Sequence, residues 1–378
     1  MYHAIIVGAG AAGAVVARQL AEKNWKVLVI EKKGHIAGNC YDEKDEHGVL
    51  IHVYGPHIFH TNNESVYEYL SKFTDWYAFH HEVVANVHGK YMPVPFNLHT
   101  LREAFGEETA ARLKEKLVST YGMGTKVPIL DLMQHEDGDL QMVGKFVYDN
   151  IYVYYTMKQW GKKPEEIDPA VTARVPVNIS YDNGYFADKY QGVPAEGFTK
   201  MFERILDHPN IEVRLHTEAK DVLEIAEGKV YFEHEPFEGK VVFTGPLDEF
   251  FDCKYGRLPY RTLRFDFEHY EQEDYQGHSV VNYTVDQDYT RITEYKWLTG
   301  QKCQGTTISK EYPFAYTGAE GEIPYYSIAN EENHALYEKY RGEVRGAENF
   351  HLLGRLAEYQ YYNIDVMVEK ALALAENL

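Results

Sequence analysis

The sequence predicts an α/β protein in which a parallel sheet is assembled from both ends of the chain, with a helical insertion and an antiparallel β-sheet insertion between them. Two N-terminal stretches carry this prediction: His3–Val7 and Lys26–Ile30 are typical of short buried strands, and a helical pattern separates them. A third observation is the C-terminal order of a strand over 349–353, Gly354, and a helix that begins near Asn363. With 378 residues, the chain has room for two or three domains.

Further elements follow along the middle of the chain. Residues 31–55 are rich in glycine and polar side chains and predict a loop. Helical periodicity covers 66–73, returns after Thr100, a candidate N-cap, and continues in patches to about Trp160. Charged residues and three prolines predict another loop over 161–176. Strand patterns then dominate 229–297, at 229–232, 240–244, 261–267, 279–284 and 290–295.

These patterns divide the chain into three predicted domains. A Rossmann-like domain combines residues 1–80 with about 195–245 and 345–378. A helical domain covers about 97–190. An antiparallel β-sheet domain combines about 81–96 with 246–344.

The turn after the first strand carries the motif G-x-G-x-x-G at Gly8, Gly10 and Gly13. The first glycine permits a tight turn, the second lets the backbone approach a pyrophosphate, and the third lets helix pack on strand. The N-terminus of the following helix favours negative charge. Glu31 ends the second strand 18 residues after Gly13, close to the spacing of about 20 for a carboxylate that binds ribose hydroxyls. Together these features predict a dinucleotide site.

Two further features favour FAD over NAD as that dinucleotide. Gly38 and Asn39 belong to a second glycine-bearing loop, which suits the pyrophosphate of a long, extended cofactor. The helix capped by Asn363 would stabilise an anionic reduced flavin if its N-terminus faced the pyrimidine edge of the ring. NAD would leave this C-terminal helix unexplained.

Composition excludes several other partners. The chain has 38 Lys and Arg against 58 Asp and Glu, a formal net charge of −20, so we expect neither nucleic acid nor an anionic membrane surface as a partner. A small anionic ligand remains compatible with this net charge, because a few arginines can dominate the potential of one cleft.

The three cysteines are far apart, which predicts no disulfide framework and a reducing, cytoplasmic location. The longest apolar run, 4–17, is shorter than the roughly 20 residues of a membrane span.

The chain shows no acid–base pair, nucleophile motif or cluster of metal ligands, so no metal is expected. His57 and His60 lie in one loop, where a structural role and a hydrogen bond donated to the flavin are about equally supported. Trp160 ends an aromatic cluster that is either core or a stacking face for a uracil or a sugar. Arginines next to aromatic residues suggest a diphosphate clamp; they are Arg174, Arg261, Arg291 and Arg355. These residues predict a flavoprotein that acts on a bulky anionic substrate.

Longer motifs run through the whole chain. They are G-A-G-A-A-G (8–13), E-K-K-G-H-I-A-G-N (31–39), Y-G-P-H-I-F-H-T-N (54–62), P-F-N (95–97), Y-T-M-K-Q-W-G (155–161), A-R-V-P-V (173–177), Y-D-N-G-Y-F (181–186), Y-Q-G-V-P (190–194), T-G-P-L-D (244–248), Y-R-T-L (260–263), Y-T-R-I-T-E (289–294), K-E-Y-P (310–313), I-P-Y-Y (323–326) and G-R-L-A-E-Y-Q-Y-Y (354–362). In these motifs and their order the sequence resembles the bacterial UDP-galactopyranose mutases. K-Q-W-G, I-P-Y-Y and G-R-L-A-E-Y are the most specific of them.

The resemblance implies an isomerase that interconverts UDP-galactopyranose and UDP-galactofuranose without net redox change. It implies reduced FAD as the cofactor, with flavin N5 as the nucleophile on the anomeric carbon and UDP as the leaving group, and NADPH or dithionite as possible reductants. That role for the cofactor explains the missing acid–base pair. The resemblance further implies a cytoplasmic homodimer, a mobile lid in the helical domain, and a product used for cell-surface glycans.

The resemblance also implies roles for particular residues. Those expected to be catalytic are Arg174, on the lid, Arg355, Trp160 and His57. Cofactor contacts are expected at Gly8, Gly10, Ala12, Gly13, Glu31, Lys32, Gly38, Asn39, His57, Ile58, Arg355, Tyr362, Asn363, Ile364, Asp365 and Met367. Substrate contacts are expected at His81, Tyr155, Thr156, Trp160, Arg174, Tyr185, Phe186, Arg261, Asn282, Arg291, Tyr325 and Tyr361.

The sequence departs from the family pattern at two positions. Asn363 stands where several relatives have Asp, and His81 replaces an Asn found in some of them.

Two other functions are compatible with the same nucleotide-binding fold. A flavin amine oxidase or desaturase would consume an electron acceptor in proportion to product, and a non-catalytic UDP-sugar binding module would form no furanose.

Overall fold

The computed structural model describes residues 1–161, 163, 166 and 176–378. Arg174 therefore lies outside the described residues. Among those that are described, no helix is both long enough and apolar enough to cross a membrane. Cys40, Cys253 and Cys303 are all free thiols.

A five-stranded parallel sheet forms the nucleotide-binding core, and both ends of the chain contribute to it. Its order is β12 (Ile211–Arg214), β2 (Val27–Ile30), β1 (Ala4–Val7), β16 (Lys240–Phe243) and β22 (Phe350–Leu352). The residues of β1 and β2 are buried throughout, as expected for strands covered on both faces. The predicted α/β fold with a Rossmann-like domain is confirmed.

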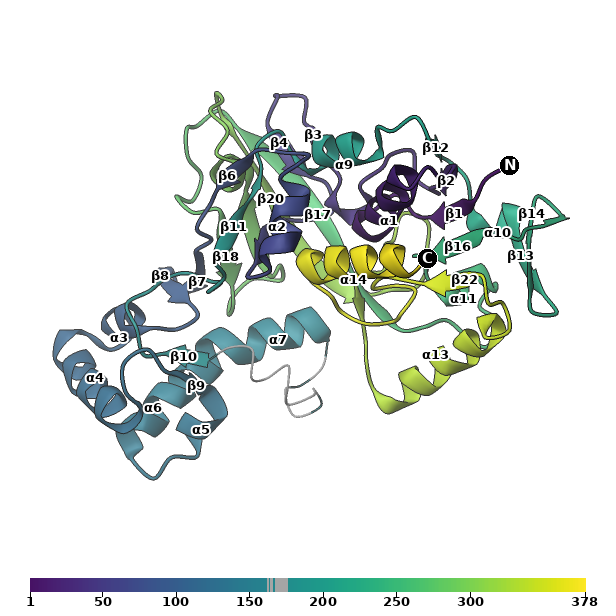
Figure 1. Cartoon of the computed structure of the whole chain (residues 1–378). Coiled ribbons are helices and arrows are strands. Elements are labelled where there is room, and N and C mark those ends of the chain that lie inside the picture. The colour runs from purple at the N-terminus through teal and green to yellow at the C-terminus, as the bar shows by residue number, and fades with distance from the viewer. Residues whose placement is uncertain (162, 164–165, 167–175) are drawn as a thin grey trace.

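Helices cover one face of this sheet. The helices α1 (Ala11–Glu22) and α14 (Ile364–Asn377) lie side by side, and α9 (Phe198–Leu206) packs beside α1 (Figure 1). Because side chains alternate along a strand, Ala4 and Ile6 of β1 pack with these helices. Ile5 and Val7 face a second core on the other side of the sheet. That core includes α10 (Ala219–Val222), α11 (Leu247–Phe250) and α13 (Glu331–Val344).

The helical region gathers around its own apolar core. Its elements are α3 (Leu98–Phe105), α4 (Glu107–Tyr121), α5 (Ile129–Met133), α6 (Gly138–Val147), a π-helical turn (Tyr148–Tyr152), α7 (Val153–Trp160) and the strand pair β9 (Lys126–Pro128) and β10 (Pro176–Asn178). The first helix begins earlier than predicted, since its N-cap is Asn97 and not Thr100. Asn97 and Thr100 form a capping box: the Asn97 side chain accepts from the Thr100 backbone N–H, and the Thr100 hydroxyl accepts from the Asn97 backbone N–H.

A seven-stranded sheet forms the third region. Its order is β21 (Tyr326–Ser327), β17 (Tyr260–Tyr270), β20 (Thr306–Ala315), β19 (Arg291–Glu294), β18 (Val280–Tyr283), β7 (Val83–Val87) and β8 (Lys90–Val94). The sheet is antiparallel, as predicted, except that β18 runs parallel to β7. These two strands are far apart in the sequence, so no tight hairpin constrains their relative direction. Two elements, β20 and α13, were not predicted from the sequence.

Short elements complete the chain. The predicted loop over 31–55 contains a 3-10 turn (Gly38–Cys40) and a hairpin of β3 (Asp42–Lys44) and β4 (Leu50–His52). The other elements are β5 (Phe59–Thr61), α2 (Glu64–Leu70), β6 (Trp76–Ala78), β11 (Tyr190–Pro194), β13 (Leu223–Ala226), β14 (Lys229–Phe232), β15 (Glu235–Pro236) and α12 (Tyr295–Thr299). Asp42 ties the hairpin to the core, because its carboxylate accepts from the backbone N–H groups of Phe198 and Thr199 at the start of α9.

Candidate active site

The turn between β1 and α1 has the geometry that the glycine motif predicts. Gly8 has φ +100°, and a Cβ there would lie 2.1 Å from Thr244 Oγ1. A Cβ on Gly13 would lie 1.9 Å from the Gly8 carbonyl oxygen, so only glycine allows helix and turn to approach this closely. Gly10 faces Gly38 across a gap in which a Cβ would be 3.5 Å from the Gly38 Cα. The two glycine-bearing loops therefore meet.

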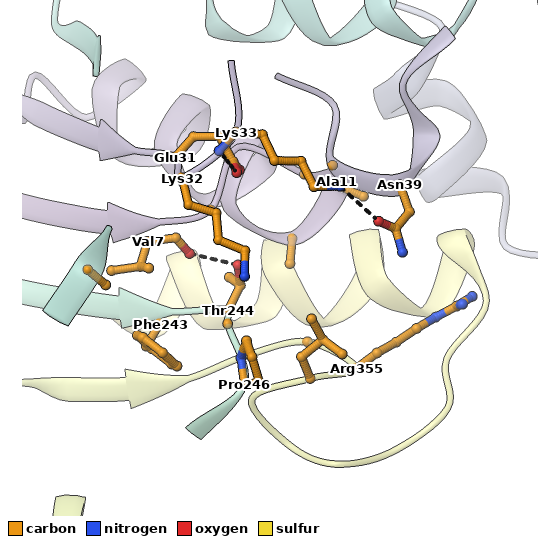
Figure 2. Close-up of a pocket in the computed structure, with 18 of the residues that line it drawn as sticks. Val7, Ala11, Glu31, Lys32, Lys33, Asn39, Phe243, Thr244, Pro246 and Arg355 are labelled. Carbon is orange, nitrogen blue, oxygen red and sulfur yellow. Dashed lines mark hydrogen bonds between the residues drawn. The ribbon is translucent and has the colours of Figure 1, made fainter. Parts of the chain in front are cut away.

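A cavity, here called the glycine-rich cavity, opens at the carboxyl ends of β1, β2 and β16 (Figure 2). Ligands of open α/β sheets bind at this edge. The predicted residues that line it are Gly8, Gly10, Ala12, Glu31, Lys32, Gly38, Asn39, His57, Tyr325, Arg355, Ile364 and Met367. Gly13 lies below the turn, and Tyr362 and Asp365 are not part of the lining.

Glu31, which lines this cavity, is held by two backbone hydrogen bonds. Its side chain accepts from the backbone N–H of Ala9 (2.9 Å, Oε2) and from that of Lys33 (2.9 Å, Oε1). The Lys33 ammonium lies 3.4 Å from Asn39 Oδ1 and 3.8 Å from the centre of the Tyr54 ring. Burial lowers the pKa of Lys33 to about 8. The sequence analysis did not single out Lys33, which also lines the cavity.

A second cavity, here called the aromatic cavity, lies between α7 and the seven-stranded sheet. Its lining includes most of the predicted substrate residues: His81, Tyr155, Thr156, Trp160, Tyr185, Phe186, Asn282, Arg291 and Tyr361. Two predicted cofactor residues, Ile58 and Asn363, also line it. His60, the other loop histidine, is present as well, stacked on Phe186 with ring centres 3.7 Å apart.

One of the charged side chains that line this cavity, Arg291, belongs to a buried ion pair. Arg291 Nε lies 3.1 Å from Glu311 Oε1, and the Glu311 side chain is only 3% exposed. The Arg291 guanidinium also donates to the Tyr155 hydroxyl (2.8 Å). Burial by itself disfavours the charged guanidinium, but the Glu311 carboxylate outweighs this and the pKa of Arg291 is raised. Arg291 therefore stays cationic inside the cavity, and Glu311 and Tyr155 fix its direction.

Several polar atoms in the aromatic cavity are buried without a hydrogen-bond partner among the described residues. They are His81 Nδ1, Gln159 Oε1, Asn282 Oδ1 and Tyr152 Oη. Buried polar atoms normally have a partner. These four are therefore available to a polar ligand. Burial lowers the pKa of His81 to about 3, so its imidazole is neutral at physiological pH.

This burial predicts a pH effect on stability. A histidine whose pKa is depressed in the folded state loses stability as pH falls below its unfolded value of about 6.5, because only the unfolded chain takes up the proton. Between pH 7 and pH 5 we expect His81 to cost the folded protein about 2 kcal/mol. Urea unfolding of the wild type and of His81→Asn at both pH values should show the wild type losing that much more. Equal losses would mean that His81 is protonated in the folded protein.

The two cavities are joined. His57, Arg355 and Ile364 line both of them. Arg355 donates through Nε to the Tyr362 carbonyl, and its guanidinium lies 4.4 Å from the centre of the Tyr361 ring. These contacts hold a positive charge at the junction, where a group extending from the glycine-rich cavity would meet a ligand in the aromatic cavity.

His57 is a neutral residue at this junction. Burial, with smaller effects from His52 and Arg355, lowers its pKa to about 3. Its Nδ1 lies 2.8 Å from the Gly55 carbonyl oxygen and must donate to it. In the neutral ring Nε2 is then a hydrogen-bond acceptor. Of the two roles that the sequence left open for His57, the bond to Gly55 is a structural one, and it uses the N–H that a hydrogen bond donated to the flavin would need.

Two predicted substrate residues lie elsewhere. Arg261 is buried behind α7, where Nε donates to the Gln159 carbonyl (2.9 Å) and a terminal nitrogen donates to the Lys158 carbonyl (3.1 Å). A cation at a helix C-terminus stabilises the helix dipole. Arg261 therefore holds the end of α7, next to Trp160, without lining either cavity. Tyr325 lines the glycine-rich cavity, while its neighbour Tyr326 lines the aromatic one.

Sequence reasoning missed Tyr326, Gln159 and Tyr152, which all line the aromatic cavity. Tyr326 and Gln159 belong to the I-P-Y-Y and K-Q-W-G motifs, so those motifs were the available signal. Tyr152 ends the π-helical turn that leads into α7. Such turns are frequent at functional sites, but no pattern in the sequence marks them.

The residues present fit a bound FAD. The two glycine-bearing loops meet without side chains between them, and Glu31 directly follows β2. Asn363 occupies the N-cap position of α14, as predicted, but its side chain forms no capping hydrogen bond, so the first N–H groups of the helix are not capped by it. Asn363 and Ile364 both line the aromatic cavity, and Ile364 also lines the glycine-rich one.

Comparisons with known proteins agree with this architecture. A family model described as UDP-galactopyranose mutase matches residues 150–361, and a model of an NAD(P)-binding Rossmann-like domain matches residues 6–73. A probable UDP-galactopyranose mutase of Klebsiella pneumoniae is 39% identical over 98% of this chain and 93% of its own length. A dTDP-fucopyranose mutase of Escherichia coli is 37% identical over 100% of this chain and 98% of its own length.

Solved structures show the same fold. A reduced UDP-galactopyranose mutase superposes with a TM-score of 0.69 at 14% identity, covering 100% of this chain and 93% of that one. A putrescine oxidase superposes with a TM-score of 0.57 at 12% identity, covering 100% of this chain and 98% of that one. The fold is therefore shared with oxidases, whereas the full-length sequence identity is to mutases. The chain belongs to the UDP-galactopyranose mutase family and is an isomerase.

Proposed function

We propose that this protein interconverts UDP-galactopyranose and UDP-galactofuranose with reduced FAD as its cofactor. The observation that carries the proposal is the junction of the two cavities at His57, Arg355 and Ile364. A dinucleotide in the glycine-rich cavity would extend to the mouth of a cavity rich in tyrosine and arginine. When bound and reduced, FAD supplies a nucleophile, its N5 atom, for the anomeric carbon of the sugar.

The chain's own residues bind and polarise the substrate in this proposal. Arg291 and Arg355 bring two fixed positive charges to one cavity, and a diphosphate needs such charges when it departs as a leaving group. Burial raises the pKa of Tyr155 to about 12, so its hydroxyl stays protonated. Trp160 offers a ring 6.4 Å from that of Tyr326, and both can exclude water from the sugar.

The aromatic cavity also offers polar atoms that could recognise the base of the substrate. His81, Gln159 and Asn282 bring unpartnered polar atoms there. A pyrimidine carries both hydrogen-bond donors and acceptors on its edge, which such atoms can match. Predictions that follow from family membership are a homodimer, a lid that includes Arg174, and use of the product in cell-surface glycans.

The Escherichia coli relative favours a second candidate substrate, dTDP-fucopyranose. That relative is nearly as similar as the Klebsiella protein and covers the whole chain. The two substrates differ at the base, the pentose and the sugar C6 group, whereas both carry the diphosphate that the arginines would bind. The same reaction type therefore serves either substrate.

One experiment separates these possibilities. Purified protein should be yellow and carry about one FAD per chain. After reduction with dithionite it should convert UDP-galactofuranose to UDP-galactopyranose, and chromatography of the reaction mixture measures the product. Oxidised protein should be much slower, because the oxidised flavin is not nucleophilic. Parallel reactions with dTDP-fucopyranose measure the substrate preference as a ratio of kcat/KM. Oxygen uptake in proportion to product would indicate an oxidase, and binding without conversion would indicate a sugar-nucleotide sensor; either result contradicts the proposal.

A further inference from the structure

We propose that His47, His269 and Glu271 form a zinc site that fastens the β3–β4 turn to the seven-stranded sheet. Their ligand atoms all lie within 4.8 Å of one another. Two imidazoles and one carboxylate, completed by water, are a ligand set that Zn²⁺ accepts. No sequence motif indicates this site, because His47 is separated by more than 200 residues from His269 and Glu271.

His269 lies near the end of β17 that is far from Arg261, and Glu271 follows the last residue of that strand, Tyr270. The two residues are close along the chain, and their ligand atoms lie within reach of one ion. Glu271 is exposed and makes no ion pair with any residue that the structure describes. A carboxylate beside two histidines, without a protein cation, is a suitable partner for a metal ion.

Hydrogen bonds around His269 set its tautomer. Thr307 Oγ1 donates its proton to Asp45 Oδ2 (2.6 Å), since an ionised carboxylate can only accept. Thr307 Oγ1 must then accept from His269 Nδ1, which lies 2.9 Å away. In the neutral ring the lone pair is therefore on Nε2. A histidine whose other nitrogen donates to a fixed partner is the arrangement found around metal ligands.

The Asp45 carboxylate, which accepts from Thr307, also organises the turn that carries His47. Asp45 Oδ1 accepts from the backbone N–H groups of His47 (3.0 Å) and Val49 (2.8 Å). One side chain thus positions both histidine ligands, the first through the turn and the second through Thr307. Thr307 is only 2% exposed, so this support is part of the packed structure.

The present arrangement of the rings shows what binding would change. His47 and His269 are stacked, with ring centres 3.7 Å apart and an angle of 10° between planes. In parallel stacked rings the nitrogen lone pairs point in parallel directions and do not converge on one point. His47 is exposed, and its side chain must rotate before both imidazoles can bind the same ion. Gly305 packs closely against the His269 ring, because a Cβ there would lie only 2.7 Å from Nε2, so a larger residue at this position would obstruct that ligand atom.

The test uses untagged, flavin-loaded enzyme freed of metal with a chelator and titrated with ZnCl₂ by calorimetry. We expect one Zn²⁺ per chain to bind with micromolar or tighter affinity and to raise the melting temperature by a few degrees. His47→Ala and Glu271→Gln should each weaken binding at least tenfold. His269→Phe, which keeps a ring in the stack, should abolish it. Mutase activity should not change, so the result does not depend on the proposed function.

His88→Asn is the matched control. His88 is an exposed histidine beside a carboxylate, 3.3 Å from Asp286, but outside the cluster. Its replacement should leave the titration unchanged. The proposal is overturned if no saturable binding occurs, if the three cluster variants bind as the wild type does, or if binding weakens equally in His88→Asn. In those cases the two rings are only a surface stack.

Discussion

Replacing Arg355 with alanine should lower turnover of the reduced enzyme at least about 100-fold, an effect of about 3 kcal/mol on the transition state. Arg355 lines both cavities, and its Nε donates to the Tyr362 carbonyl. In the proposed reaction it would present a fixed charge to the diphosphate, which gains charge as it leaves. Arg355→Lys should recover only part of the activity, because lysine keeps the charge without the planar, two-pronged donor.

The measurement is single-turnover conversion of UDP-galactofuranose, with flavin content determined in each preparation. Arg345→Ala is the control, since the Arg345 side chain is 74% exposed and pairs only on the surface with Glu338. Activity that returns fully when excess FAD is added to Arg355→Ala would mean that Arg355 only retains the cofactor. That result would remove its proposed role toward the substrate.

Replacing Arg291 with methionine should destabilise the fold by about 3–5 kcal/mol, because it leaves the Glu311 carboxylate buried without its cation. Glu311 is 3% exposed at the side chain, and Thr290 Oγ1, which donates to it over 2.8 Å, does not neutralise its charge. Such a loss is a large part of the total stability of a folded protein. Urea unfolding measures it.

The double variant Arg291→Met with Glu311→Gln separates stability from function. Replacing the unpaired Glu311 carboxylate with an uncharged amide should restore most of the unfolding free energy. Turnover should stay at least about 100-fold below wild type, because the cavity still lacks the Arg291 cation. If the double variant recovers activity along with stability, Arg291 acts only through the fold. If Arg291→Met alone is as stable as wild type, the ion pair is not buried in solution.

Local sequence was sufficient for the elements that form the nucleotide turn. The short apolar strands, the spacing of Gly8, Gly10 and Gly13, and the C-terminal helix starting after Asn363 all follow from nearest-neighbour chemistry. Backbone sterics permit few residues other than glycine in that turn, and buried strands require apolar side chains, so each rule acts within a few residues. The resemblance of longer motifs to a known family then correctly identified the family, which residue-level reasoning alone had reached only as a flavoprotein with an anionic substrate.

Only the tertiary structure decided which of two adjacent tyrosines enters each cavity. Tyr325 and Tyr326 are the same residue type, so the sequence does not distinguish them. Successive residues near a strand point to opposite sides, and a shift of one residue in register would exchange the cavities that the two side chains line. Arg261 shows the same limit, because its partners are backbone carbonyls of Lys158 and Gln159, which no side-chain pattern reveals.

The sequence by itself thus determined the fold class, the nucleotide turn and the family, since those depend on local backbone preferences and on motifs that are contiguous in the chain. The tertiary structure alone decided the pairing of Arg291 with Glu311, the neutral state of His57 and His81, and the meeting of His47 with His269. These properties depend on burial and on distances between residues that are separate in sequence. Both arise only when strands and helices pack together, because desolvation and charge pairing act through space.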